Sequence, residues 1–70
     1  MRVAFSQLFR ELPEGGYSPV RQTRIKGVDL NPGLWIGQGT EIVGVDLSSL
    51  AGRELEVDME QGVAVLKAAY

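Results

Sequence analysis

Residues 24–47 of this 70-residue chain read RIKGVDLNPGLWIGQGTEIVGVDL and contain one phrase twice. Ile25–Leu30 (IKGVDL) is echoed by Ile42–Leu47 (IVGVDL), with a glycine at the same offset in each copy. Between the copies, turn-forming residues flank a short apolar run, Leu34–Ile36. The pattern predicts strands over about 20–26, 34–36 and 41–47. Because a glycine inside a strand marks a bulge or a bend, it also favours strands that bend at equivalent points.

The first twelve residues show the spacing of one helical face, with apolar side chains at Met1, Ala4, Phe5, Leu8, Phe9 and Leu12. Val3 is the one misfit. Pro13 and the Gly15-Gly16 pair would end a helix, so the spacing predicts a helix over 2–12 that packs on the sheet. A strand through Val3, Phe5 and Phe9 is the competing interpretation, which Gln7 interrupts. Residues 13–19 have the composition of a connector.

The C-terminal third gives the clearest pattern. Asp46, Ser48 or Ser49 is suited to cap a one-turn helix that ends at Gly52. Acidic and apolar residues then alternate over 54–60, which predicts a half-buried strand. Gln61-Gly62 is a tight turn, and Val63–Tyr70 is the returning strand. This last strand is apolar on both faces, so it should be covered by the helix or by another subunit.

These elements predict an α+β, mainly β fold in a single domain, residues 1–70. One N-terminal helix (1–12) and a connector (13–19) precede a β-rich part (20–70). The expected sheet is small, antiparallel and strongly bent, with about five strands, either open or partly closed as a barrel.

The composition excludes several kinds of function. The chain has no Cys and no His, so it lacks disulfides, the usual zinc ligands and the groups for Ser-His or Cys-His catalysis. We expect no enzyme, no cofactor, no membrane span and a cytoplasmic location. A 70-residue chain buries a marginal core, and self-association is the stabilising device that remains.

Charge is unevenly distributed along the chain. Residues 1–26 carry five basic and two acidic groups, a balance of +3, whereas residues 27–70 carry two basic and seven acidic groups, a balance of −5. Pairing within one fold explains this split more simply than pairing between subunits. The acidic stripe Glu54, Glu56, Asp58 and Glu60 is best interpreted as a solvated face, next as a partner of Arg or Lys on a neighbouring strand, and last as a calcium site.

The first functional hypothesis is a non-enzymatic protein-interaction module that self-associates. Its expected interface is the last strand, the helix or both, through Phe5, Phe9, Val63, Val65, Leu66 and Tyr70. The alternative is a small-barrel binder of single-stranded nucleic acid, with Arg21, Arg24 and Lys26 as the basic cluster and Tyr17 or Trp35 as stacking platforms. Trp35 is the strongest candidate for binding. A lone Trp in a domain of this size is more often core, here with Ile36, Ile42, Val45 and Leu55.

Overall fold

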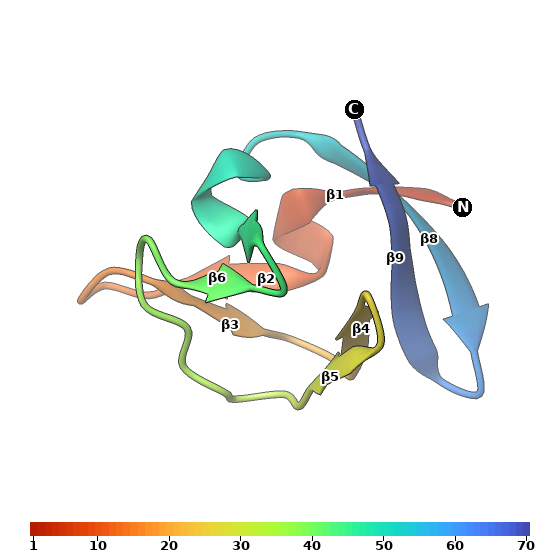
Figure 1. Ribbon diagram of the computed structural model, residues 1–70, viewed down its shortest axis with the longest axis horizontal. Coiled ribbons are helices and arrows are strands. Elements are labelled where there is room, and N and C mark those ends of the chain that lie inside the picture. The colour runs from red at the N-terminus through yellow and green to blue at the C-terminus, as the bar shows by residue number, and fades with distance from the viewer.

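The longest elements are two strands joined by a two-residue turn at the C-terminal end of the chain. The structure is a computed structural model that describes residues 1–70. In it, β8 (Glu54–Glu60) and β9 (Val63–Ala69) pair antiparallel, as the alternation predicts, with Glu60 opposite Val63. The register shifts where Glu56 faces Ala68 and Val57 faces Leu66, so Lys67 is an extra residue of β9 without a partner in β8. This hairpin is the long blue ribbon of Figure 1.

β8 and β9 form the middle of a five-stranded sheet with the order β1-β8-β9-β4-β5, which is not closed into a barrel. β4 runs parallel to β9, so the expectation of a wholly antiparallel sheet is wrong. Two further sheets have two strands each, β2-β3 and β6-β7. The remaining elements are β1 (Arg2–Ala4), β2 (Phe9–Glu11), β3 (Tyr17–Pro19), β4 (Thr23–Ile25), β5 (Val28–Leu30), β6 (Glu41–Ile42), β7 (Val45–Asp46) and the 3-10 turns η1 (Phe5–Gln7) and η2 (Leu47–Ser49).

The repeated phrase forms two tight hairpins. Its first copy joins β4 to β5 with Ile25 opposite Val28, and its second joins β6 to β7 with Ile42 opposite Val45. Both turn positions are left-handed in each copy, with φ of 49° and 83° at Lys26 and Gly27, and 49° and 79° at Val43 and Gly44. Two left-handed residues define the turn whose twist matches that of paired strands. Each glycine is therefore a turn residue, and the predicted bends within continuous strands are wrong.

The helix predicted over 2–12 is absent, and no α-helix occurs in the structure. This segment forms β1, η1 and β2. β1 pairs with β8, which places the misfit Val3 opposite Leu55. The 3-10 turn brings Phe5 and Leu8, three residues apart, to the same side, and both are buried. Phe9, the first residue of β2, is buried as well. The strand–turn–strand arrangement thus buries Phe5, Leu8 and Phe9 of the predicted helical face, leaves Met1 and Ala4 exposed, and pairs β1 with the edge of β8.

Two other segments differ from the prediction. The connector 13–19 contains β3, which pairs with β2. The apolar run Leu34–Ile36 forms no strand and makes a single bridge, in which Tyr17 and Ile36 exchange two main-chain hydrogen bonds of 2.8 Å. The capped turn after Asp46 is confirmed, because the Asp46 side chain accepts a hydrogen bond from the Ser48 main chain at 2.9 Å.

The core lies between the five-stranded sheet and the smaller sheets. Twelve buried hydrophobic residues form one cluster. At one end, the ring centroid of Phe5 lies 5.0 Å from that of Phe9 and 5.4 Å from that of Tyr17. No helix is long and apolar enough to cross a membrane.

Candidate binding surface

Trp35 lies on the surface, contrary to the expectation that a lone Trp belongs to the core. Its side chain is 61% exposed, and that of its neighbour Leu34 is 44% exposed. The bridge with Tyr17 explains this orientation, because it turns Ile36 into the core and extended neighbours point to opposite faces. Leu34 is exposed as well, so the loop between β5 and β6 carries two consecutive exposed apolar residues.

Three glycines hold the Trp35 ring in place. The indole Nε1–H lies 3.4 Å from the carbonyl oxygen of Gly15. A Cβ at Gly16 would lie only 3.1 Å from Nε1, and a Cβ at Gly37 only 3.1 Å from Cη2 of the ring. The indole therefore rests on bare backbone at two points while its other surface is open. An exposed aromatic side chain fixed in this way loses little rotamer freedom on binding.

Tyr17, the other predicted stacking platform, is buried. It is 6% exposed and stands edge-on to Phe5. A base or a partner side chain could not lie flat on its ring without opening the core. The structure therefore separates the two aromatic candidates, with Tyr17 inside and Trp35 outside.

Of the predicted basic cluster, Arg21 and Lys26 are free to contact a ligand, whereas Arg24 is paired within the chain. Arg24 donates a hydrogen bond from Nε to Asp29 Oδ1 at 2.6 Å, across the β4–β5 pair. This contact raises the pKa of Arg24 and lowers the pKa of Asp29, mainly through the hydrogen bond itself. Arg21 and Lys26 are exposed, and Lys26 sits in the hairpin turn.

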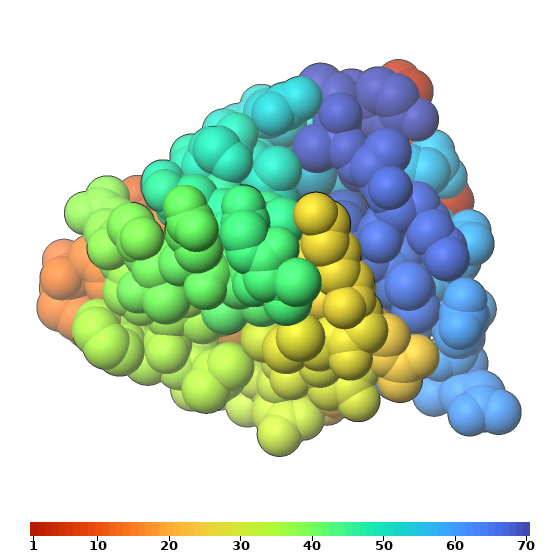
Figure 2. Space-filling view, in the orientation of Figure 1, coloured from red at the N-terminus to blue at the C-terminus, as the bar shows by residue number.

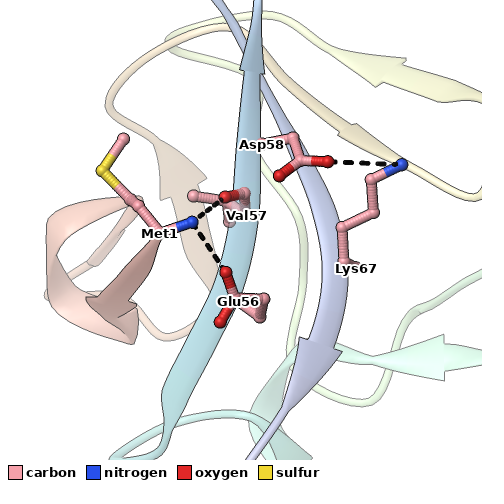
Figure 3. Close-up of polar contacts among 5 residues, drawn as sticks. All are labelled: Met1, Glu56, Val57, Asp58 and Lys67. Carbon is pink, nitrogen blue, oxygen red and sulfur yellow. Dashed lines mark hydrogen bonds and ion pairs between the residues drawn. The ribbon is translucent and has the colours of Figure 1, made fainter.

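The acidic stripe faces solvent, and three of its four carboxylates pair with cations from the same sheet, so the first two of its three interpretations both hold. Lys67 Nζ lies 3.9 Å from Asp58 Oδ2, and the Met1 amino group donates to Glu56 Oε2 and to the Val57 carbonyl oxygen at 2.6 Å each; Figure 3 shows these contacts. Arg2 Nη1 lies 3.4 Å from Glu54 Oε1. No group of three or more acidic, His or Cys side chains is placed to hold a metal ion.

The residues expected at a subunit interface have different environments. Phe5 and Phe9 are core residues, 6% and 2% exposed, and offer little surface to a second chain. Val63 and Val65 are half-buried on the charged outer face. Leu66 lines a groove beside β9. The Arg2 guanidinium carbon lies over the Tyr70 ring, 4.0 Å from the ring centroid. The last strand thus offers no continuous exposed apolar face.

Two hollows indent the surface. The larger, of about 450 Å³, is bordered by aromatic core residues and by Arg53, Glu11 and Glu54. The smaller, of about 200 Å³, lies between β9 and the segment around Val45 and Leu50. Neither is visible in the sequence, because each joins segments that are distant along the chain.

Comparison with protein families, with curated proteins and with solved structures finds no match to this chain.

Proposed function

We propose that this chain is a non-enzymatic protein-interaction module that self-associates through the surface around Trp35. The observation that supports the proposal is the fixed, 61% exposed indole beside the exposed Leu34. Trp is the residue most enriched among those that dominate binding energy at protein interfaces. The proposal retains the cytoplasmic location expected from the sequence.

The exposed indole is a large source of binding energy for so small a domain. A Trp side chain contributes roughly 250 Å² of surface, so a 61% exposed one offers about 150 Å² for burial. At about 25 cal/mol per Å², covering this area is worth ~4 kcal/mol before the costs of association. Leu34, the preceding residue, is also exposed, at 44%. By contrast, the outer face of the sheet carries ion pairs that are exposed to solvent, and such pairs contribute little free energy.

The test combines absolute mass with fluorescence. Light scattering over a dilution series should give a mass above 7.6 kDa that falls on dilution, and Trp35→Ala should remain at 7.6 kDa throughout. Tyr70→Ala is the matched control, since Tyr70 is also an exposed aromatic residue, at 54%, but lies on the outer face of the sheet. It should associate as the unmodified chain does.

Intrinsic fluorescence gives an independent readout, because Trp35 is the only Trp in the chain. Its emission should shift to shorter wavelength as concentration rises and the indole leaves water. A mass that exceeds 7.6 kDa equally in the Trp35→Ala variant, or an emission maximum that stays constant while the mass rises, would contradict the proposal.

The nucleic-acid hypothesis keeps Trp35 as a stacking platform but loses two expected contributors. Tyr17 is buried and Arg24 is paired with Asp29, which leaves Arg21 and Lys26. Stacking of bases on an exposed indole quenches its fluorescence, and contacts with phosphate weaken as salt rises. Salt-sensitive quenching by a single-stranded oligonucleotide, with no change in mass on dilution, would favour this alternative over self-association.

A further inference from the structure

Strand β9 has a partner on both sides over only part of its length. β8 pairs with it as far as Ala69, whereas β4 is matched only with Ala64 and Val65. β4 then turns away at Lys26 into the hairpin with β5. Residues 66–69 consequently have β8 on one side and no strand on the other. Figure 1 shows β4 beside only one part of the long β9 ribbon.

The direction of the backbone identifies which groups face the open side. The Tyr70 N–H donates to the Glu54 carbonyl oxygen at 2.8 Å, towards β8. Because C=O and N–H of one peptide unit point in opposite directions, the Ala69 carbonyl faces away from β8. Arg53 Nη2 lies 3.3 Å from this oxygen and caps that end of the edge. The Ala69 N–H lies on the same open side, since N–H and C=O of one strand residue share a side.

An apolar groove runs along this open edge. Its volume is about 200 Å³, and Ile25, Val45, Leu50 and Leu66 supply its large apolar side chains. Two lysines, Lys26 and Lys67, border it, and no carboxylate does. In Figure 2, the yellow β4–β5 hairpin, the green-to-teal segment and the blue-violet C-terminal strand meet on the face in view.

We propose that this edge binds an extended segment of a different protein, in which apolar and acidic residues alternate. Added beside Leu66–Ala69, such a segment would place its apolar side chains in the groove. Its acidic side chains would point to the outer face of the sheet, where Lys67 lies. β8 already makes this arrangement on the other side of β9: Leu55 and Val57 are buried, and Asp58 lies 3.9 Å from Lys67 Nζ.

Charge argues for such a partner rather than for a second copy of this chain. Two copies joined edge to edge through Leu66–Ala69 would bring two Lys67 side chains and two Lys26 side chains to one interface. Like charges brought together in this way oppose association, whereas acidic residues on the added strand would attract these lysines. The site does not include Trp35, so it is independent of the function proposed above.

The test uses a fluorescently labelled peptide with the sequence of β8, ELEVDME, titrated with the whole chain and followed by fluorescence anisotropy. Lys26→Glu/Lys67→Glu should weaken binding about tenfold or more, since it replaces two attractions by repulsions. Arg10→Glu/Arg21→Glu is the matched control. It changes the net charge equally at exposed residues outside the groove and should bind as the unmodified chain does. Circular dichroism establishes that each variant is folded.

Two further measurements separate strand addition from simple charge attraction. The peptide LVMEEDE has the same composition without the alternation and should bind about tenfold more weakly or not at all. Amide exchange at Ala69 should slow when ELEVDME binds, because its N–H gains an acceptor. Equal binding of both peptides, an equal effect of the two charge reversals, or unchanged exchange at Ala69 would overturn the proposal. Trp35→Ala should bind the peptide normally, so the two proposals fail or stand separately.

Discussion

Replacing Val43 by Asn should stabilise the protein. Val43 occupies the first position of the β6–β7 turn with φ of 49°. The left-handed conformation costs an ordinary L-residue about 1–2 kcal/mol, and a β-branched residue is a clear outlier there. Asn and Gly are the residues that this turn prefers, because they accept positive φ at little cost. Gly44 already supplies the second position.

The expected gain follows from two opposing contributions. Relief of the left-handed strain contributes about 1–2 kcal/mol. The loss is smaller because Val43 is 50% exposed: half of the ~1.5 kcal/mol for complete burial of a Val is about 0.7 kcal/mol. The net change is a stabilisation of about 0.3–1.3 kcal/mol. For a domain of this size, that raises Tm by roughly 1–10 °C.

Thermal and denaturant unfolding of Val43→Asn and Val43→Ala, compared with the unmodified chain, provide the assay. Val43→Ala removes the same packing but keeps most of the left-handed cost, so it should gain little or lose stability. Gln61→Asn, at φ of 53° in the β8–β9 turn, replaces an unbranched residue and should gain less than Val43→Asn. If Val43→Asn is no more stable than Val43→Ala, backbone strain at this turn is not what limits stability.

Two further changes test the loop beneath Trp35 and the capped turn. Gly16→Ala should destabilise the fold by about 2–4 kcal/mol in urea unfolding, because its Cβ would lie 2.5 Å from the Ile36 carbonyl oxygen at φ of 89°. A Cβ at Gly15 would lie 3.9 Å from its nearest neighbouring atom, so Gly15→Ala should lose only the about 1–2 kcal/mol of the left-handed conformation. Equal losses of stability in the Gly15→Ala and Gly16→Ala variants would refute the role assigned to the close contact at Gly16. The hydroxyl and main-chain hydrogen bonds from Ser48 lower the pKa of Asp46 in the folded protein. The ionised Asp46 therefore stabilises the fold fully above its unfolded pKa of about 3.9. This contribution is lost as the pH falls through the lower pKa of the folded protein. Melting curves from neutral to acidic pH should therefore show a smaller loss of Tm for Asp46→Asn than for the unmodified chain, and parallel curves would argue against this contribution.

Sequence patterns predicted the elements whose interactions are local. The alternation over 54–60 identifies β8, Gln61-Gly62 identifies its turn, and the Asp46 cap identifies η2. Each of these depends on residues only a few positions apart. The N-terminal segment could not be predicted in this way. Its helical spacing also fits a strand, a 3-10 turn and a second strand, and the choice depends on pairing with β8, more than fifty residues away.

The candidate site was only partly predictable for the same reason. The sequence identified Trp35 but could not show that it faces solvent, because its orientation depends on the bridge between Tyr17 and Ile36. It identified the repeat but not its hairpins, since Val43 favours strands and is unusual at positive φ. The open edge of β9 depends on its parallel pairing with β4, a contact for which the sequence contains no local signal.

Two of the regions where the local interpretation was wrong also show unusual features. Residues 31–46 were expected to contribute two strands, but they hold an exposed Trp35 and a turn with Val43 in a left-handed conformation. Where local preferences disagree with the fold, function or strain is the usual reason. Selection for folding alone would favour Asn at Val43 and a smaller, polar residue at Trp35. If Val43→Asn raises stability but weakens self-association, the strained turn belongs to the interaction surface. If stability rises and self-association is unchanged, the strain has no part in binding.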